Sequence, residues 1–263
     1  FVRRNRIDDF ATVTSVLERT RPRDHDRHLP LRGEERRCRG NGHRHPEKPH
    51  PDSPAFRRNA LIDKKPEFFV GVPGYETVDD VTRNRASLVE FCYQSAIYHD
   101  LGKISMPTII NNCFRRLTDH EFDIIQLHPE KASKFLAIDP SLKQYQDIVL
   151  GHHKWYDGEG YPAKFKNRKS PYFPIICIVT LCDCMDAATE NIGRNYHTPR
   201  SFDAVMKEFS SLSGEQFHPE LIDFIMSDNY THKRMKLVID DGRYDNYYKL
   251  YMKYMDQSKK KKR

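Results

Sequence analysis

The sequence predicts an all-α protein, a bundle of packed helices, on three observations. From Leu61 onward, apolar residues recur at spacings of three and four, which is the period of an amphipathic helix. Turn residues separate these segments, and the alternating pattern of β-strands is missing from them. No internal repeat is present. We therefore expect successive helices around one apolar core, preceded by an irregular segment.

The clearest helix is expected over residues 84–99, where Leu88, Cys92, Ala96 and His99 recur at helical spacing. His99 therefore ends an otherwise apolar stripe. Further helices with an apolar face are expected over residues 141–153 and 172–188, and these end in or contain histidine and aspartate.

A signal for the start of another helix lies between the helices expected at 84–99 and 141–153. Thr118 is followed three residues later by Glu121, which is the pattern of a capping box. Pro129 should then bend the chain or restart the helix, because proline removes a backbone donor. His128 precedes that proline and lies on the apolar side of the expected helix.

Residues 1–58 are expected to be a separate, irregular segment. Residues 21–58 are rich in Arg, His and Pro and hold few apolar side chains, so this stretch cannot bury enough surface to fold alone. Two alternatives stay open: a His-rich metal-binding tract, and a stretch that is not native sequence. We place the globular domain at 61–226 and a C-terminal extension with a basic tail at 227–263.

The net charge of +7 is unevenly distributed. Residues 1–58 carry 15 Lys/Arg and 9 Asp/Glu, and residues 259–263 add +5, which leaves −4 for residues 59–258. A mildly acidic body with basic ends argues against binding to duplex nucleic acid. We expect no membrane span, since no apolar run approaches the ~18 residues required. The scattered cysteines favour a cytoplasmic protein with reduced thiols.

Four of the expected helices carry His or Asp on the same side as their apolar stripe. Buried carboxylates are costly unless they are paired or bound to metal, and imidazole with carboxylate suits Mn, Fe and Zn. Six such groups suffice for two metals, which at ~4 Å separation can activate water and stabilise a phosphoryl displacement. The candidates are His99, Asp100, His128, His152, His153 and Asp183.

Taken singly, each of these residues has a simpler explanation. His128 could be a satisfied core histidine, and His152 and His153 could be one core and one surface residue. Asp183 could cap a helix or pair with an arginine, and Lys103 could be an ordinary surface lysine. The joint placement of the six candidates on core faces of successive helices favours a metal centre.

Two runs of residues resemble a known enzyme family. The run His-Asp-Leu-Gly-Lys-Ile at 99–104 is similar to the HD-x-G-K signature of the HD phosphohydrolase superfamily. The run at 152–162, two histidines followed by Asp-Gly-Glu-Gly-Tyr-Pro, resembles the HHxxxDGxGYP signature of the HD-GYP subfamily. The resemblance covers 90–226 well and 61–89 loosely, and it implies an HD-type helical bundle. Shorter matches lie at 128–129, 183–187, 194–196 and 217–220.

The resemblance also implies an activity. HD-GYP proteins hydrolyse cyclic di-GMP, a bacterial second messenger, or a related cyclic dinucleotide, to the linear dinucleotide or to GMP. The six candidates would hold two divalent ions, iron or manganese, with Asp100 bridging them. Lys103, expected one helical turn past His99, would act with Asp100 in catalysis and contact the scissile phosphate. Arg194 would be a second phosphate contact. Tyr161 could stack on guanine; the alternative is that its loop only shapes the fold.

The chain departs from the family pattern upstream of the HD pair. Members usually carry a further histidine on an earlier helix, and residues 61–69 contain no histidine. We therefore assign no third metal, and we expect Glu67 to be a surface residue rather than a ligand. A missing first helix would also uncover part of the core. His197, and two extra residues between Asp186 and Arg194, could retune substrate contacts.

Four functions are compatible with these features. An active cyclic dinucleotide phosphodiesterase ranks first, because the ligand set for two metals is complete. A degenerate module that binds a nucleotide or a partner protein without turnover ranks second. Another HD phosphohydrolase and a nucleic-acid-binding protein rank below these. A sensor or receiver domain in a longer parent chain, and a homodimer, are the partners that the family resemblance suggests.

Overall fold

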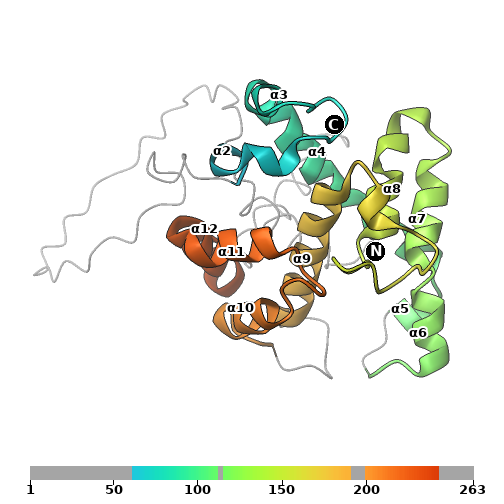
Figure 1. Ribbon diagram of the computed structural model, residues 1–263. Coiled ribbons are helices and arrows are strands. Elements are labelled where there is room, and N and C mark those ends of the chain that lie inside the picture. The colour runs from blue at the N-terminus through green and yellow to red at the C-terminus, as the bar shows by residue number, and fades with distance from the viewer. Residues whose placement is uncertain (1–60, 112–114, 191–198, 243–263) are drawn as a thin grey trace, which may run out of the picture.

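The computed structural model describes residues 61–111, 115–190 and 199–242 (Figure 1). Within these ranges every regular element is helical and only isolated β-bridges occur, which confirms the all-α class. The α-helices are α2 Leu61–Lys64, α3 Val78–Arg83, α4 Arg85–Tyr98, α5 Thr108–Asn111, α6 Asp119–Ile125, α7 His128–Leu136, α8 Gln146–Gly151, α9 Phe173–Thr189, α10 Phe202–Ser211, α11 Pro219–Ser227 and α12 Asn229–Leu237. The shorter turns are η2 Pro66–Phe69, η3 Leu101–Ser105, η4 Pro140–Tyr145, η5 Asn167–Lys169 and η6 Val238–Gly242.

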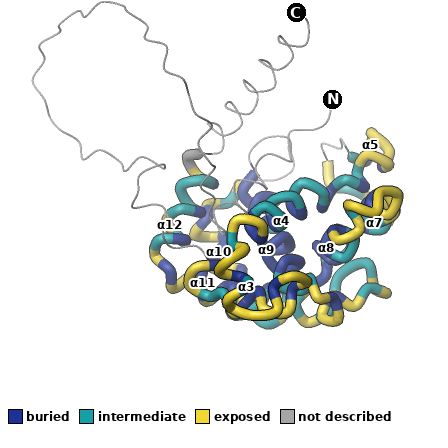
Figure 2. The backbone as a smooth tube through the Cα atoms, turned by 90° about the horizontal axis from the view of Figure 1, so that it is seen from above, coloured by how far each residue is buried: buried dark blue, intermediate teal, exposed yellow. Residues whose placement is uncertain are grey.

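Helix α9 is the central element of the core. Eleven of its 17 residues are buried, including Ile175, Ile176 and Leu181. It contacts α4 and α8 on one side and α10 on another, so it lies between the two halves of the bundle in Figure 1. The burial colours of Figure 2 show the same helix inside and yellow, exposed turns at α5 and α7. A helix buried all round needs no polar face.

The expected helix positions are largely confirmed, with two differences. The helix expected at 84–99 is α4, and the expected capping box is present, because Thr118 and Glu121 bond each other's backbone N–H at the start of α6. Pro129 restarts the chain as α7 after α6 ends at Ile125. The segment 141–153 is less regular than expected, since a 3-10 turn precedes the short α8. Lys103 lies in the 3-10 turn η3, so α4 does not continue to it.

The ends of the described core are closed by short elements. Leu61, Ile62 and Phe69 are buried in the main apolar cluster, which therefore receives cover from the segment before α3. The same cluster includes Met235 and Ile239, so it continues past residue 226. The division of the chain into an N-terminal segment, a domain and an extension stays a prediction, because residues 1–60 and 243–263 lie outside the described ranges.

Across the described residues, we find no helix that combines the length and the apolar character needed to traverse a bilayer.

Candidate metal centre

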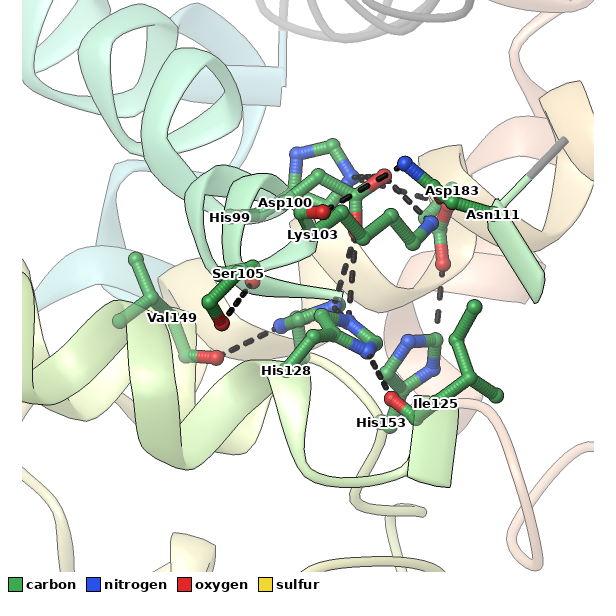
Figure 3. A network of polar contacts seen from close by, with 12 residues as sticks. His99, Asp100, Lys103, Ser105, Asn111, Ile125, His128, Val149, His153 and Asp183 are labelled. Atoms are coloured by element: carbon green, nitrogen blue, oxygen red, sulfur yellow. Dashed lines mark hydrogen bonds and ion pairs between the residues drawn. The ribbon is translucent and has the colours of Figure 1, made fainter. Parts of the chain in front are cut away.

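Helix ends bring most of the candidate ligands to one place. His99 caps the C-terminus of α4, His128 begins α7, and His152 caps the C-terminus of α8. Asp183 comes from the middle of α9. In Figure 3 the rings of His99, His128 and His153 and the carboxylates of Asp100 and Asp183 point toward a common centre.

The same local bond orients three of the imidazole rings. Nδ1 of His99, His128 and His152 lies 2.7, 2.6 and 2.7 Å from the carbonyl oxygen three residues earlier. A carbonyl oxygen can only accept a hydrogen bond, so each Nδ1 carries the proton. Each ring therefore turns Nε2 toward the centre, which is the arrangement that metal-binding histidines adopt.

The donor atoms lie close together across the centre. His128 Nε2 is 3.3 Å and His152 Nε2 is 3.9 Å from Oδ1 of Asp100. His99 Nε2 lies 3.6 Å from Oδ2 of Asp100 and 3.7 Å from Oδ1 of Asp183. Asp100 therefore lies within 4 Å of three of the four histidines, with which it would hold a divalent cation.

Burial keeps two of the histidines neutral. Burial, followed by the neighbouring imidazoles, holds the pKa of His152 well below its usual 6.5. Burial lowers the pKa of His153 to about 3. Burial also acts to lower the pKa of His99, but the carboxylates of Asp100 and Asp183 outweigh it and the net shift is upward.

The two carboxyl groups stay ionised although they are buried. Burial raises the pKa of Asp100, but the charges of Lys103 and His99 outweigh it and hold the pKa well below its usual value. Burial likewise raises the pKa of Asp183, and the contacts with His99 and His153 reverse that shift. The centre therefore combines anionic carboxylates with neutral imidazoles at His152 and His153, the protonation states that a metal needs.

This donor set fits divalent cations. Within the described residues, two groups have ligand atoms that all lie within 4.8 Å of one another, and they share His152. Nε2 of His128 lies 3.1 Å from Nε2 of His152, a spacing at which both nitrogens could bind one cation. The groups are His128, His152 and His153, and His99, His152 and Asp183.

A close backbone contact explains the glycine of the first motif. A Cβ on Gly102 would lie 1.8 Å from the carbonyl oxygen of His128 and 2.8 Å from the amide nitrogen of Ala132. Only glycine lets η3 approach α7 this closely. This approach sets the spacing between Asp100 and His128, so Gly102 shapes the centre without contacting it.

The loop 155–162 places Tyr161 over the centre. The ring of Tyr161 stacks on His153, with centroids 4.5 Å apart and planes at 28°. A Cβ on Gly160 would lie 2.3 Å from the carbonyl oxygen of His153, so this glycine too is required by a close approach. The buried Lys154 donates from Nζ to the Gly160 carbonyl oxygen at 3.0 Å and ties the loop to α8. Burial, and then Asp183 and Asp100, raise the pKa of Tyr161, which keeps the phenol neutral.

Lys103 lies at the edge of the centre. Its Nζ donates to Oδ2 of Asp100 at 2.6 Å, and the side chain remains partly exposed. Asn111 on α5 donates to the backbone oxygen of Lys103 at 3.4 Å (Figure 3). The ammonium is thus held beside the carboxylate and open to a ligand that approaches from solvent.

The structure brings eight of the nine predicted site residues together. The six candidate ligands, Lys103 and Tyr161 form one cluster, whereas Arg194 lies outside the described residues. Glu67 is exposed and pairs with Lys65, as expected of a surface residue. Sequence reasoning missed Lys154, because a lysine in a loop carries no pattern that marks it.

Comparisons with known proteins cover part of the same region of the chain. Residues 84–176 match the family model described as the HD domain. Residues 84–176 of this chain are thus similar to an HD domain. That match runs from the start of α4 to the first residues of α9, and it therefore includes His99, Asp100, His128, His152 and His153. It ends before Asp183.

Curated relatives extend the comparison. A "Cyclic di-GMP phosphodiesterase" of Thermotoga maritima is 34% identical over 131 residues, 49% of this chain and 34% of the relative. A protein of the same name from Vibrio cholerae is 28% identical over 179 residues, 65% of this chain and 35% of the relative. The "3'3'-cGAMP-specific phosphodiesterase 2" of Vibrio cholerae is 26% identical over 130 residues, 49% of this chain and 24% of the relative. The chain thus spans about a third or less of the length of these relatives.

Proposed function

We propose that this chain is a metal-dependent phosphodiesterase that hydrolyses a cyclic dinucleotide, with cyclic di-GMP as the first candidate substrate. The observation that carries the proposal is the convergence of four imidazoles and two carboxylates from four parts of the bundle. The substrate class is taken from the names of the relatives, two of which are cyclic di-GMP phosphodiesterases. Water would cleave one P–O ester bond and leave a phosphomonoester and a hydroxyl group.

Two divalent ions, iron or manganese, would be held by the six candidate ligands, with Asp100 between them. Bound ions of this kind lower the pKa of water and offset charge on phosphate oxygens. The chain's own residues prepare that site. Nδ1–H bonds to carbonyl oxygens fix the rings of His99, His128 and His152, so that Nε2 faces inward without reorganisation.

Lys103 and Tyr161 would bind the substrate. The ammonium of Lys103 is held beside Asp100 and offers positive charge where a phosphate oxygen gains negative charge. Arg194 is proposed as a second phosphate contact from the sequence motif alone. The ring of Tyr161 lies on His153, and it would contact a nucleobase as the phosphate reaches the metals.

The cellular setting follows from the same proposal. A cyclic dinucleotide is an intracellular messenger, so we expect the chain to act in the cytoplasm. A sensor or receiver domain in a longer parent chain and a homodimer stay proposals from the family resemblance.

The test is anaerobic incubation of the purified chain with iron(II) or manganese(II) and cyclic di-GMP, with products followed by chromatography. Asp100→Ala is the control, because that carboxylate contacts His99, His128 and His152. We expect metal-dependent loss of substrate that is absent in the control. Turnover by Asp100→Ala would contradict the mechanism.

Two other outcomes would redirect the proposal. A folded, metal-loaded chain that binds cyclic di-GMP without cleaving it would be a binding module. Faster cleavage of 3'3'-cGAMP than of cyclic di-GMP would change the substrate within the same class, as the third relative suggests.

A further inference from the structure

Phe122 on α6 is an aromatic side chain that is not buried in the core. Its exposed fraction is 48%, and α6 contains no buried residue. The helix is held by polar contacts instead, since the capping box of Thr118 and Glu121 closes its first turn and Arg115 pairs with Glu121. Burial of Phe122 in the core therefore does not explain the position of its ring.

The ring of Phe122 lies beside Tyr161, the residue proposed above to contact a nucleobase. Its centroid is 6.4 Å from that of Tyr161, and the two planes meet at 82°. Tyr161 in turn stacks on His153, a candidate ligand. The three rings thus form a continuous aromatic path from the metal centre to the surface of α6.

Tyr161 alone has limited surface to offer a nucleobase. One face of its ring is covered by His153, and burial and the nearby carboxylates of Asp183 and Asp100 surround the phenol. Phe122 provides uncovered ring surface at the next position outward. A base attached to a phosphate held at the metals needs such a surface a few ångströms away, because stacking on an aromatic ring offsets its desolvation.

We propose that Phe122 is a substrate-binding residue that stacks on a nucleobase of the cyclic dinucleotide, next to Tyr161. The inference rests on the proposed function, since it names a contact for that substrate. Stacking uses the π-face that every base has, so Phe122 should strengthen binding without choosing between guanine and adenine.

The experiment compares Phe122→Ala with wild type in steady-state hydrolysis of cyclic di-GMP and of 3'3'-cGAMP by the metal-loaded chain. We expect KM to rise about tenfold for whichever of the two substrates is cleaved, equivalent to about 1.4 kcal/mol, while kcat changes less than about twofold. The variant should stay folded, because α6 buries no residue in the core. Thermal unfolding measures this point.

Three further variants separate stacking from support. Phe122→Tyr keeps an aromatic ring and should restore the wild-type KM, whereas Phe122→Leu keeps only apolar bulk and should not. Ile138→Ala removes an apolar side chain that is 81% exposed and should leave KM unchanged. If Phe122 only supported Tyr161, leucine would rescue the variant and kcat would fall with alanine.

The outcomes distinguish this inference from the proposed function. An unchanged KM in Phe122→Ala, or rescue by leucine, overturns the role of Phe122 and leaves the phosphodiesterase intact. Absence of cyclic dinucleotide turnover by the wild-type chain overturns the proposed function, and the inference with it. A selective KM rise with tyrosine rescue supports both.

Discussion

Helices α9 and α6 both contribute to the candidate site, but the fold holds them in opposite ways. Eleven of the 17 residues of α9 are buried, and none of the seven residues of α6 is. Helix α9 supplies Asp183, whereas α6 supplies the Ile125 carbonyl that bonds His128 and the exposed ring of Phe122. The side of the site that α9 contributes is therefore anchored in the core, whereas the side that α6 contributes depends on polar capping contacts at the surface.

The largest effect on the site is expected from Asp183→Asn, which changes a candidate ligand on the buried helix α9. The amide keeps the size of the side chain but removes the anion that faces His99 and His153. We expect metal affinity to fall at least ~100-fold, the upper range for losing a supporting group around a metal, with little change in the fold. Calorimetric titration with manganese(II) measures the loss. An unchanged affinity would remove Asp183 from the ligand set.

Gly102→Ala should produce the next largest effect, by forcing η3 away from α7. The added Cβ would meet the backbone of His128 at 1.8 Å, and backbone cannot yield as a side chain can. We expect a loss of about 1–3 kcal/mol or more in the free energy of unfolding, together with weaker metal binding. Denaturant unfolding measures the first quantity.

The matched control for that clash is Gly158→Ala. An added Cβ at this position meets nothing within 4 Å, but φ is +101°, so only backbone strain is introduced. Gly102 does not have a positive φ, so this kind of strain does not contribute there. A smaller loss for Gly102→Ala than for Gly158→Ala would show that the approach to His128 costs little.

A smaller and more local effect is expected from Thr118→Ala, which removes the cap of α6. Loss of an N-cap costs ~1 kcal/mol, so amide exchange within α6 should quicken about fivefold. Because α6 contributes no buried residue, the midpoint of global thermal unfolding should hardly move. Hydrogen exchange with mass spectrometry measures the local change, and Thr118→Ser, which keeps the hydroxyl, is the control. A large fall in global stability would show that α6 is not peripheral.

The smallest effect concerns pH, and it also acts on α6. The Arg115 guanidinium, followed by the Thr118 backbone N–H, lowers the pKa of Glu121 from 4.5 to about 2. A lowered pKa means that the stabilisation is present above pH ~4.5 and is lost as the pH falls toward 2. The carboxyl resonance of Glu121 should titrate near pH 2, and a midpoint near 4.5 would contradict the capping geometry. High salt should weaken the shift, since the group is exposed.

The sequence predicted the ligand side of the site better than the outer side, for a physical reason. Burial imposes a helical period on apolar residues, so α4 and α9 are visible as patterns with His99 and Asp183 on their inner faces. Helix α6 buries no residue and is indicated instead by its capping box. His99, His152 and His153 also belong to long motifs. The turn η3 was missed because 3-10 geometry leaves no periodic signal in five residues.

Contacts between distant segments could not be predicted from one chain. The need for glycine at 102 arises from the backbone of His128, which lies 26 positions later. Phe122 meets Tyr161 only after α6 and the loop 155–162 are placed side by side. An exposed aromatic residue follows no period, so the sequence alone gave no reason to select it.

The three bonds between Nδ1 and a carbonyl oxygen have a consequence for how such a centre is encoded. Each of His99, His128 and His152 takes its orientation from a residue only three positions away. The direction of these three rings is thus determined within four consecutive residues, while the packing of the core determines where each of these short segments lies. Grafting these short helix ends onto another helical bundle with the same spacing between its helices should therefore transfer the orientation of the rings.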